Sequence, residues 1–188
     1  GILLIFGPAQ QAGACGPGQS VDPTQIPKDA VAGYSGDQLT NAAYIMNAAS
    51  TLGLDRAAQI IGVMTAMGES SLRVVDHGDT AGPDSRGLFQ QRDNGAWGSL
   101  ADRMDPTISA TNFFKALERV DGWEALPPTI AAHRVQGNAD PYHYEKFYDA
   151  AATVVGTLAG KGVTVCQSGY LVFPLNPGYQ MTSNYGPR

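Results

Sequence analysis

The chain has 188 residues, of which 43% are hydrophobic, 23 are glycine and 12 are proline, and its formal net charge is −5. This length suits one domain with attached segments, and the hydrophobic content excludes wholesale disorder. Negative charge disfavours a general nucleic-acid binder, and no apolar run approaches the ~20 residues of a membrane-spanning helix. We therefore expect neither nucleic-acid binding nor stable membrane insertion.

Charged residues are concentrated in the middle of the chain. Residues 1–33 carry three of them and residues 161–188 carry two, and both ends are rich in glycine and proline. We therefore expect an N-terminal linker over residues 1–33, a folded body over 34–160, and a C-terminal segment over 161–188. That segment reads as a linker followed by a short strand. The apolar residues 1–6 fit either the end of a signal or anchor segment or a short strand.

The body begins with two predicted helices. Ser35 and Gln38 have the spacing of a capping box, and the apolar pattern that follows predicts a helix ending at Gly53. Asp55 can cap a second helix that ends at residues 68–71. This second helix is apolar on almost every side, so we expect it to be buried at the centre of the domain.

Three later helices are predicted at prolines. Asp105 precedes one that runs to residue 120, Pro128 opens one that ends near Gly137, and Pro141 opens the last, through residue 154. Residues 72–103 show no period, and a long irregular stretch inside a compact domain is usually a functional loop. The expected fold is mainly α, with a small β-hairpin or loop region and flanking extended linkers.

Glu69 is the most informative residue, because it lies at the end of the apolar central helix. A carboxyl group there would be partly desolvated, which favours its protonated form and allows it to donate a proton near neutral pH. The alternative is a helix-end glutamate that binds local backbone or a nearby arginine.

The segment DSRGLFQQR at 84–92 follows Glu69 after 15 residues. Gly87 would let another chain, or a sugar, approach the backbone closely. Gln90 and Gln91 carry donors and acceptors that suit sugar hydroxyls and amides. Leu88 and Phe89 could instead be the core side of a hairpin strand.

These two segments resemble a known family. The sequence ESSL at 69–72, followed by SRGLFQ at 85–90, is similar to the Glu-Ser … Gly-Leu-Met/Phe-Gln pattern of soluble lytic transglycosylases and goose-type lysozymes. The resemblance is closer still to the lysozyme-like modules of actinobacterial and actinophage cell-wall enzymes. The resemblance covers residues 36–155 and implies a lysozyme-like helical domain with Glu69 as the catalytic acid. The residues expected to bind substrate are Ser70, Gly87, Leu88, Phe89, Gln90, Gln91, Trp97 and Tyr144.

The rest of the site is less well matched. The family's Ala-Tyr-Asn-Ala-Gly-like segment corresponds to residues 131–137, which lack the Tyr-Asn, and its later tyrosine corresponds to Tyr142 or Tyr144. Asp76 or Asp79 could be a second carboxylate that orients water, or each could simply make a turn. The three histidines have no ligand spacing, so we expect neither metal nor cofactor.

The resemblance implies cleavage of the β-1,4 bond between N-acetylmuramic acid and N-acetylglucosamine in peptidoglycan. Both a lytic transglycosylase and a muramidase remain open, and the expected location is extracellular, in the cell wall or on a virion. The expected partners are peptidoglycan glycan strands and subunits of a phage tail or secretion complex. The alternative is a non-catalytic glycan-binding or structural module of such a complex, a reading motivated by the missing Tyr-Asn.

Two further expectations concern the ends of the chain. Residues 173–188 resemble the opening strand of lysostaphin-like zinc endopeptidases, whose metal ligands all lie downstream of that strand, so no zinc site is expected here. Cys15 and Cys166 stand just outside the two ends of the body. In an exported protein they could form a disulfide, and otherwise they are two free thiols.

Overall fold

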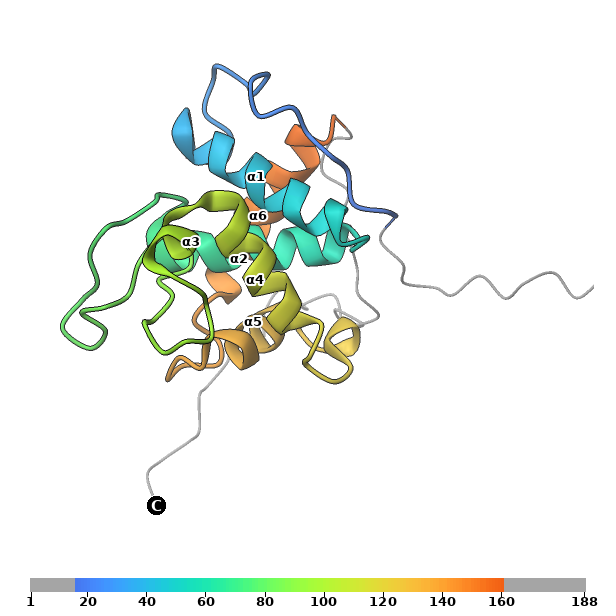
Figure 1. The fold of residues 1–188 in the computed structure, drawn as a ribbon. Coiled ribbons are helices and arrows are strands. Elements are labelled where there is room, and N and C mark those ends of the chain that lie inside the picture. Colours follow the sequence, from blue (N-terminus) through green and yellow to red (C-terminus); the bar gives the residue numbers. More distant parts are fainter. Residues whose placement is uncertain (1–15, 161–188) are drawn as a thin grey trace, which may run out of the picture.

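The computed structural model describes residues 16–160 and confirms that this part of the chain is mainly helical (Figure 1). Cys15 and Cys166, for which a disulfide and two free thiols were both left open, and the endopeptidase-like strand lie outside the described residues. The described helices are α1 (Asp37–Thr51), α2 (Arg56–Ser70), α3 (Leu100–Met104), α4 (Pro106–Leu117), η1 (Trp123–Ala125), α5 (Pro128–Gln136), η2 (Glu145–Phe147) and α6 (Tyr148–Leu158). None of them is long and apolar enough to cross a membrane.

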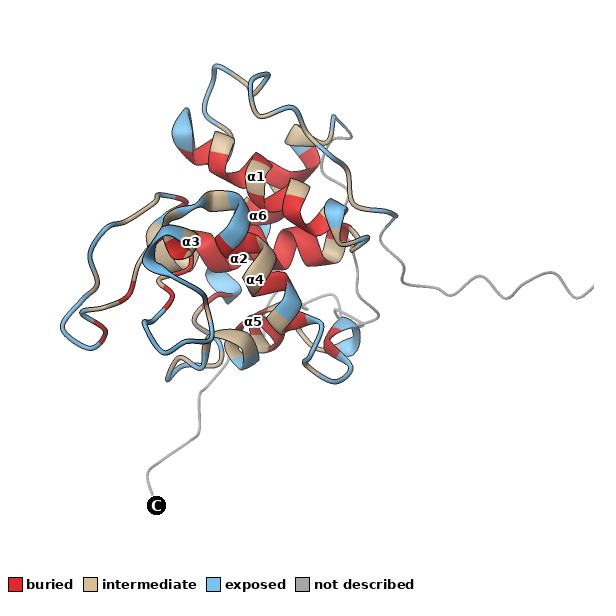
Figure 2. Cartoon of the chain, in the orientation of Figure 1, coloured by how far each residue is buried: buried red, intermediate tan, exposed pale blue. Residues whose placement is uncertain are grey.

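Helix α2 is the centre of the domain, as its apolar sequence predicts. It packs against α1, α4, α5 and α6, and its residues from Arg56 to Met67 are almost all buried (Figure 2). Gly62 allows the close approach of two of these neighbours, because a Cβ there would lie 2.5 Å from Phe114 Cζ and 2.9 Å from Ile45 Cγ2. The carboxyl end of α2 emerges beside the irregular loop that follows it.

Side-chain caps fix two of the helix starts where the sequence predicts them. Asp55 accepts a hydrogen bond from the backbone of Ala58, and Asp105 caps α4 in the same way. The first helix differs, because Gly36 is its N-cap and no side chain caps it. The last helix also differs, since the chain makes a turn and the short η2 before α6 begins at Tyr148. Helix α3 overlaps the end of the stretch 72–103, in which the apolar residues showed no periodicity.

Residues 16–34, most of which fall within the predicted N-terminal linker, lie across α1 and α2. Asn47 exchanges two hydrogen bonds with the backbone of Val21, at 2.7 and 2.8 Å. Gln59 is fully buried, and its amide donates to the carbonyl oxygens of Gln19 and Met46 and accepts from the Gln19 N–H. The side chains of Asn47 and Gln59 thus supply hydrogen-bond partners for the backbone of residues 16–34, which pairs with no strand among the described residues.

The Gln59→Leu substitution should lower the free energy of unfolding by about 2–3 kcal/mol, because it removes the hydrogen bonds that this buried amide makes to the backbone of Gln19 and Met46. Urea unfolding of the variant measures this loss. The matched control is Gln19→Ala, which keeps the backbone groups that Gln59 binds and should change stability by under about 0.5 kcal/mol. Equal losses in the two variants would contradict this role of the Gln59 amide.

Candidate active site

The segment SRGLFQQ at 85–91 folds into a tight turn. The backbones of Arg86 and Gln91 exchange two hydrogen bonds, of 3.1 and 3.0 Å, which form an isolated antiparallel bridge. The small hairpin predicted here is therefore reduced to this bridge, and none of the described residues forms an extended strand. We refer to residues 85–91 as the wall turn.

Gly87 serves the internal packing of the wall turn. Its φ is +76°, in the left-handed region that favours glycine, and a Cβ there would overlap the carbonyl oxygen of Arg103. Its N–H also donates to the carbonyl oxygen of Val75 at 2.7 Å. The close approach expected at Gly87 is therefore made by the chain itself, and the prediction that Gly87 contacts sugar is not supported.

Two predicted substrate-binding side chains of the wall turn belong to the core. Leu88 and Phe89 are fully buried, and the Phe89 ring stacks on Phe113 with centroids 4.6 Å apart. They cannot contact a ligand with their side chains, so the prediction that they bind substrate is corrected in favour of the core alternative. Their backbone carbonyls instead anchor the turn: Ser70 Oγ donates to Leu88 at 2.8 Å and Gln136 Nε2 donates to Phe89 at 2.8 Å.

Glu69 lies half-buried in the last turn of α2, and its closest polar partner is a tyrosine. The Tyr144 hydroxyl donates a hydrogen bond to Glu69 Oε1. Burial of the tyrosine, and then the negative charge of Glu69 and the hydrogen bond to it, raise the Tyr144 pKa far above its usual range. Tyr144 is fully buried, so it contacts Glu69 and not a substrate, which corrects its predicted role.

The raised pKa of Tyr144 predicts a loss of stability in alkali. Above pH 10, the ordinary value for tyrosine, the unfolded chain loses this proton while the folded chain retains it, so the free energy of unfolding falls as pH rises. The slope is about 1.4 kcal/mol per pH unit for one proton. When urea unfolding is measured between pH 8 and 11, the free energy of unfolding should decline less in Tyr144→Phe than in the wild type. The exposed Tyr142→Phe control should keep the wild-type decline, and an unchanged slope in Tyr144→Phe would contradict the prediction.

An open cleft of about 350 Å³ lies directly beside Glu69. One wall comes from the loop after α2, and the other comes from the end of α5. Trp97 and Gln90, two of the residues expected to bind substrate, line it together with Asp79. Half of the remaining lining residues are polar and uncharged, three are small and one is an arginine: Ser85, Gln91, Gln136 and Asn138, then Ala81, Gly82 and Gly137, and Arg92. We refer to this space as the Glu69 cleft.

The other predicted site residues are divided between the cleft and its supports. Gln91 touches the cleft but is only 2% exposed, and its amide donates to the carbonyl oxygen of Ser109. Ser70 faces the wall turn, as described above. Asp76 is exposed, pairs with its neighbour His77 and does not line the cleft, whereas Asp79 does. Of the two candidate second carboxylates, only Asp79 shares a cavity with Glu69.

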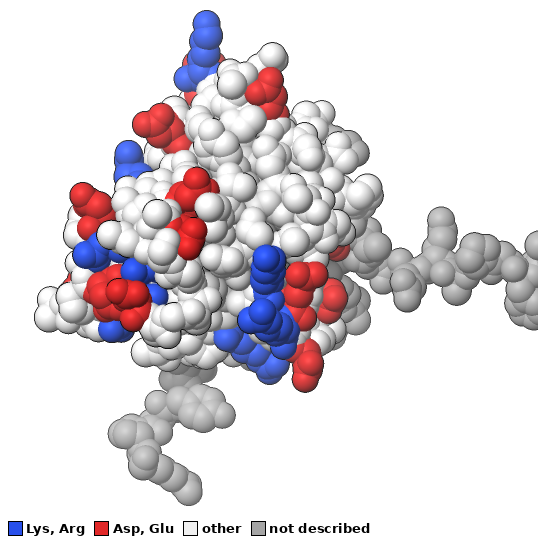
Figure 3. All heavy atoms as spheres, viewed as in Figure 1, with Lys and Arg blue, Asp and Glu red and all other residues white. Residues whose placement is uncertain are grey.

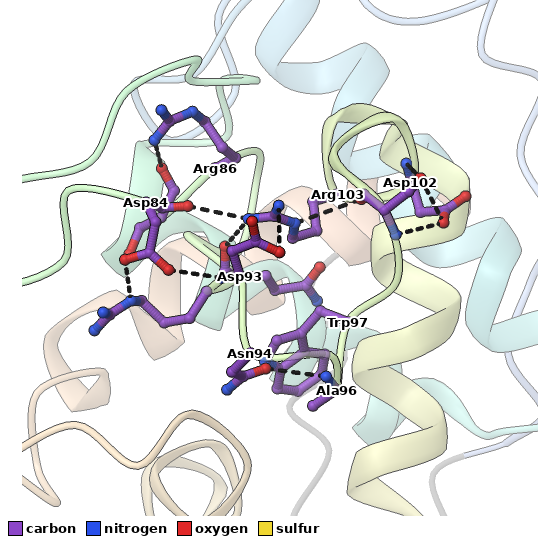
Figure 4. A network of polar contacts seen from close by, with 12 residues as sticks. Asp84, Arg86, Asp93, Asn94, Ala96, Trp97, Asp102 and Arg103 are labelled. Atoms are coloured by element: carbon purple, nitrogen blue, oxygen red, sulfur yellow. Dashed lines mark hydrogen bonds and ion pairs between the residues drawn. The ribbon is translucent and has the colours of Figure 1, made fainter.

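A buried arginine holds the loop that carries the cleft wall (Figure 4). Arg103 is 3% exposed, and its guanidinium donates to the carbonyl oxygens of Asp84 and Gln91 and forms an ion pair with Asp93 at 3.2 Å. Asp84 in turn pairs with Arg92 at 2.6 Å. Acidic and basic side chains lie close together on the left of the molecule in Figure 3.

Gln136 and Asn138 were not recognised as site residues from the sequence, although residues 131–137 were expected to correspond to a segment of the resembled family. The only local signal is their place around Gly137, the left-handed residue that ends α5. Among residues 16–160, no group of three or more His, Cys, Asp or Glu side chains could hold a metal ion.

The arrangement joins one carboxyl group, oriented by a buried tyrosine, to an open polar cleft with an indole in its wall. Such a group can donate and accept a proton at a molecule bound in the cleft. No protein-family model matches the chain, and no curated protein is significantly similar to it.

Proposed function

We propose that the domain cleaves the β-1,4 bond between N-acetylmuramic acid and N-acetylglucosamine in peptidoglycan, with Glu69 as general acid. The observation that carries the proposal is the Tyr144–Glu69 hydrogen bond at the edge of an open polar cleft. A carboxyl group with a fixed orientation at a cavity is what proton transfer to a bound leaving group requires. The resemblance of residues 69–72 and 85–90 to lytic transglycosylases and goose-type lysozymes supports the same reaction.

In the proposed reaction, Glu69 transfers its proton to the glycosidic oxygen as the bond from that oxygen to the anomeric carbon breaks. The sugar that retains the anomeric carbon passes through an oxocarbenium-like transition state. In the transglycosylase route, the 6-hydroxyl of the muramyl sugar attacks the anomeric carbon, and Glu69, now a carboxylate, accepts the proton that this hydroxyl loses. In the hydrolase route, a water attacks instead, and Asp79 is the carboxylate in the cleft that could orient it.

The composition of the cleft favours an uncharged, polar chain over a nucleotide or a lipid. Gln90, Gln136 and Asn138 present amides to it, and amides can both donate to and accept from sugar hydroxyls and acetamido groups. Trp97 is half-exposed in the same wall, where an indole can stack on the apolar face of a sugar ring. The proposed substrate lies outside the cell membrane, so the proposal places the domain in the cell wall, in the extracellular space or on a virion.

The test is incubation of the protein with purified peptidoglycan, followed by mass spectrometry of the soluble products. Glycan fragments with an anhydro end, lighter by one water than those with a reducing end, would identify the transglycosylase route. Because proton donation by a carboxylic acid needs no metal, cleavage should persist in EDTA. Binding to peptidoglycan without any released fragment would instead support the alternative, a non-catalytic module of a phage tail or secretion complex.

A further inference from the structure

Gly68 stands immediately before Glu69, where α2 meets the turn that carries Tyr144. A Cβ on Gly68 would lie 2.7 Å from Cδ1 and 3.0 Å from Cε1 of the Tyr144 ring, closer than side chains normally pack. The ring therefore occupies the space that any other side chain at position 68 would need. Phe147 Cε2 is also near, at 3.3 Å.

The backbone offers no other reason for a glycine at this position. Gly68 has no left-handed φ, unlike Gly87 or Gly137, and it lies inside the hydrogen-bonded part of α2. Alanine is intrinsically more favourable than glycine within a helix. The close contact with Tyr144 is thus the feature of this site that requires the missing side chain.

The tyrosine ring has little room to move away from an added methyl group. Its side chain is fully buried, the His143 ring packs edge-on against it at a centroid distance of 4.9 Å, and its hydroxyl binds Glu69. Widening the 2.7 Å contact to the 3.4 Å of ordinary van der Waals contact needs a displacement of about 0.7 Å. That displacement is large enough to strain or break the hydrogen bond at the other end of the ring.

Building on the function proposed above, we infer that Gly68 is a positioning residue for proton transfer. Its missing side chain lets Tyr144 lie against α2, and Tyr144 in that position fixes the carboxyl group of Glu69 at the cleft. Gly68 itself touches no reacting atom and acts only through Tyr144. Misplacement of a reacting group by about 1 Å can reduce a rate by roughly 10²-fold.

The first experiment compares Gly68→Ala with Gly62→Ala, the same substitution six residues earlier on the same helix. The nearest atoms to a Cβ at Gly62 belong to Phe114 and Ile45, so Gly62→Ala introduces comparable crowding away from Tyr144. Cleavage of peptidoglycan per folded molecule should fall by roughly 10²-fold in Gly68→Ala and stay within about twofold in Gly62→Ala. In a Tyr144→Phe background, Gly68→Ala should add little further loss, because the hydrogen bond is already absent.

A second readout needs no turnover. In protein labelled with ¹³C-tyrosine, the Tyr144 Cζ resonance, assigned by its absence in Tyr144→Phe, reports the hydrogen bond of the hydroxyl. The chemical shift of this resonance should change in Gly68→Ala and remain unchanged in Gly62→Ala. If Gly68→Ala changes neither this resonance nor the cleavage rate, the inference is wrong. If the wild type cleaves no peptidoglycan, the proposed function fails, while the resonance still decides whether Gly68 holds Tyr144 on Glu69.

A third comparison still tests the inference if the Gly68→Ala variant does not fold. In a Tyr144→Leu background the ring is gone, so Gly68→Ala should raise the melting temperature through better helix propensity. In the wild-type background the same substitution should lower the melting temperature or prevent folding. A decrease of the same size in both backgrounds would overturn the steric argument, because it would mean that the methyl group meets something other than Tyr144.

Discussion

Glu69→Gln is expected to reduce cleavage of peptidoglycan by roughly 10²–10⁴-fold, the usual loss when a positioned general acid is removed. Glutamine has nearly the same shape, but its amide protons are not acidic enough to be transferred to the glycosidic oxygen. The Tyr144 hydroxyl can still donate to the side-chain oxygen of a glutamine, so the fold and the melting temperature should be nearly unchanged. Release of soluble fragments from purified cell walls, measured against time, provides the rate.

The control for this prediction is Glu124→Gln, which removes an exposed carboxylate from η1, outside the Glu69 cleft. It should leave cleavage unchanged. A Glu69→Gln variant that releases fragments within about twofold of the wild-type rate would remove Glu69 from the mechanism. A variant that loses cleavage but still binds cell walls would place the defect in the chemical step.

Gly87→Ala is expected to have the largest effect on stability, about 3 kcal/mol or more. Two penalties act together, because alanine resists the positive φ and its methyl group would overlap the carbonyl oxygen of Arg103. The wall turn has to move to relieve that overlap, so cleavage should fall as well. Urea unfolding measures the first effect and fragment release measures the second.

Gly95→Ala separates these two penalties. Gly95 also has a positive φ, of +81°, but a Cβ there would have no neighbour within 4 Å. The free energy of unfolding of Gly95→Ala should therefore be lower by only about 1 kcal/mol, which is the conformational penalty alone. Equal losses at Gly87 and Gly95 would show that the contact with Arg103 contributes nothing to the stability of the loop.

The predictable parts of the fold are those determined by neighbours in the sequence. Asp55 and Asp105 cap helices because a carboxylate at that position meets backbone N–H groups two or three residues later. Likewise, an almost wholly apolar sequence leaves α2 no stable position but the centre. The short α3 was missed because five residues contain too little of a period to detect.

The site was predictable only in part, because its polar contacts join residues far apart in the sequence. Glu69 and Tyr144 are 75 positions apart, and nothing local to Tyr144 distinguishes a ring that binds a sugar from one that orients a carboxyl group. Gly87 has the same ambiguity, since the sequence shows that something approaches its backbone but not that it is Arg103. Gln136 reaches Phe89 across 47 positions.

The anchoring of the wall turn to α2 and α5 has a consequence for its dynamics. An irregular loop ordinarily exchanges its amide hydrogens quickly, through local openings that leave the helices intact. Here Ser70 and Gln136 tie the turn to two helix ends, and the Arg86 and Gln91 amides are bound within it. These amides should exchange with solvent as slowly as those of the helices, so the loop and the bundle would open as one cooperative unit. If a glycan strand binds in the Glu69 cleft as proposed, it would meet a turn that is already ordered, and little of its binding energy would be spent on ordering the protein.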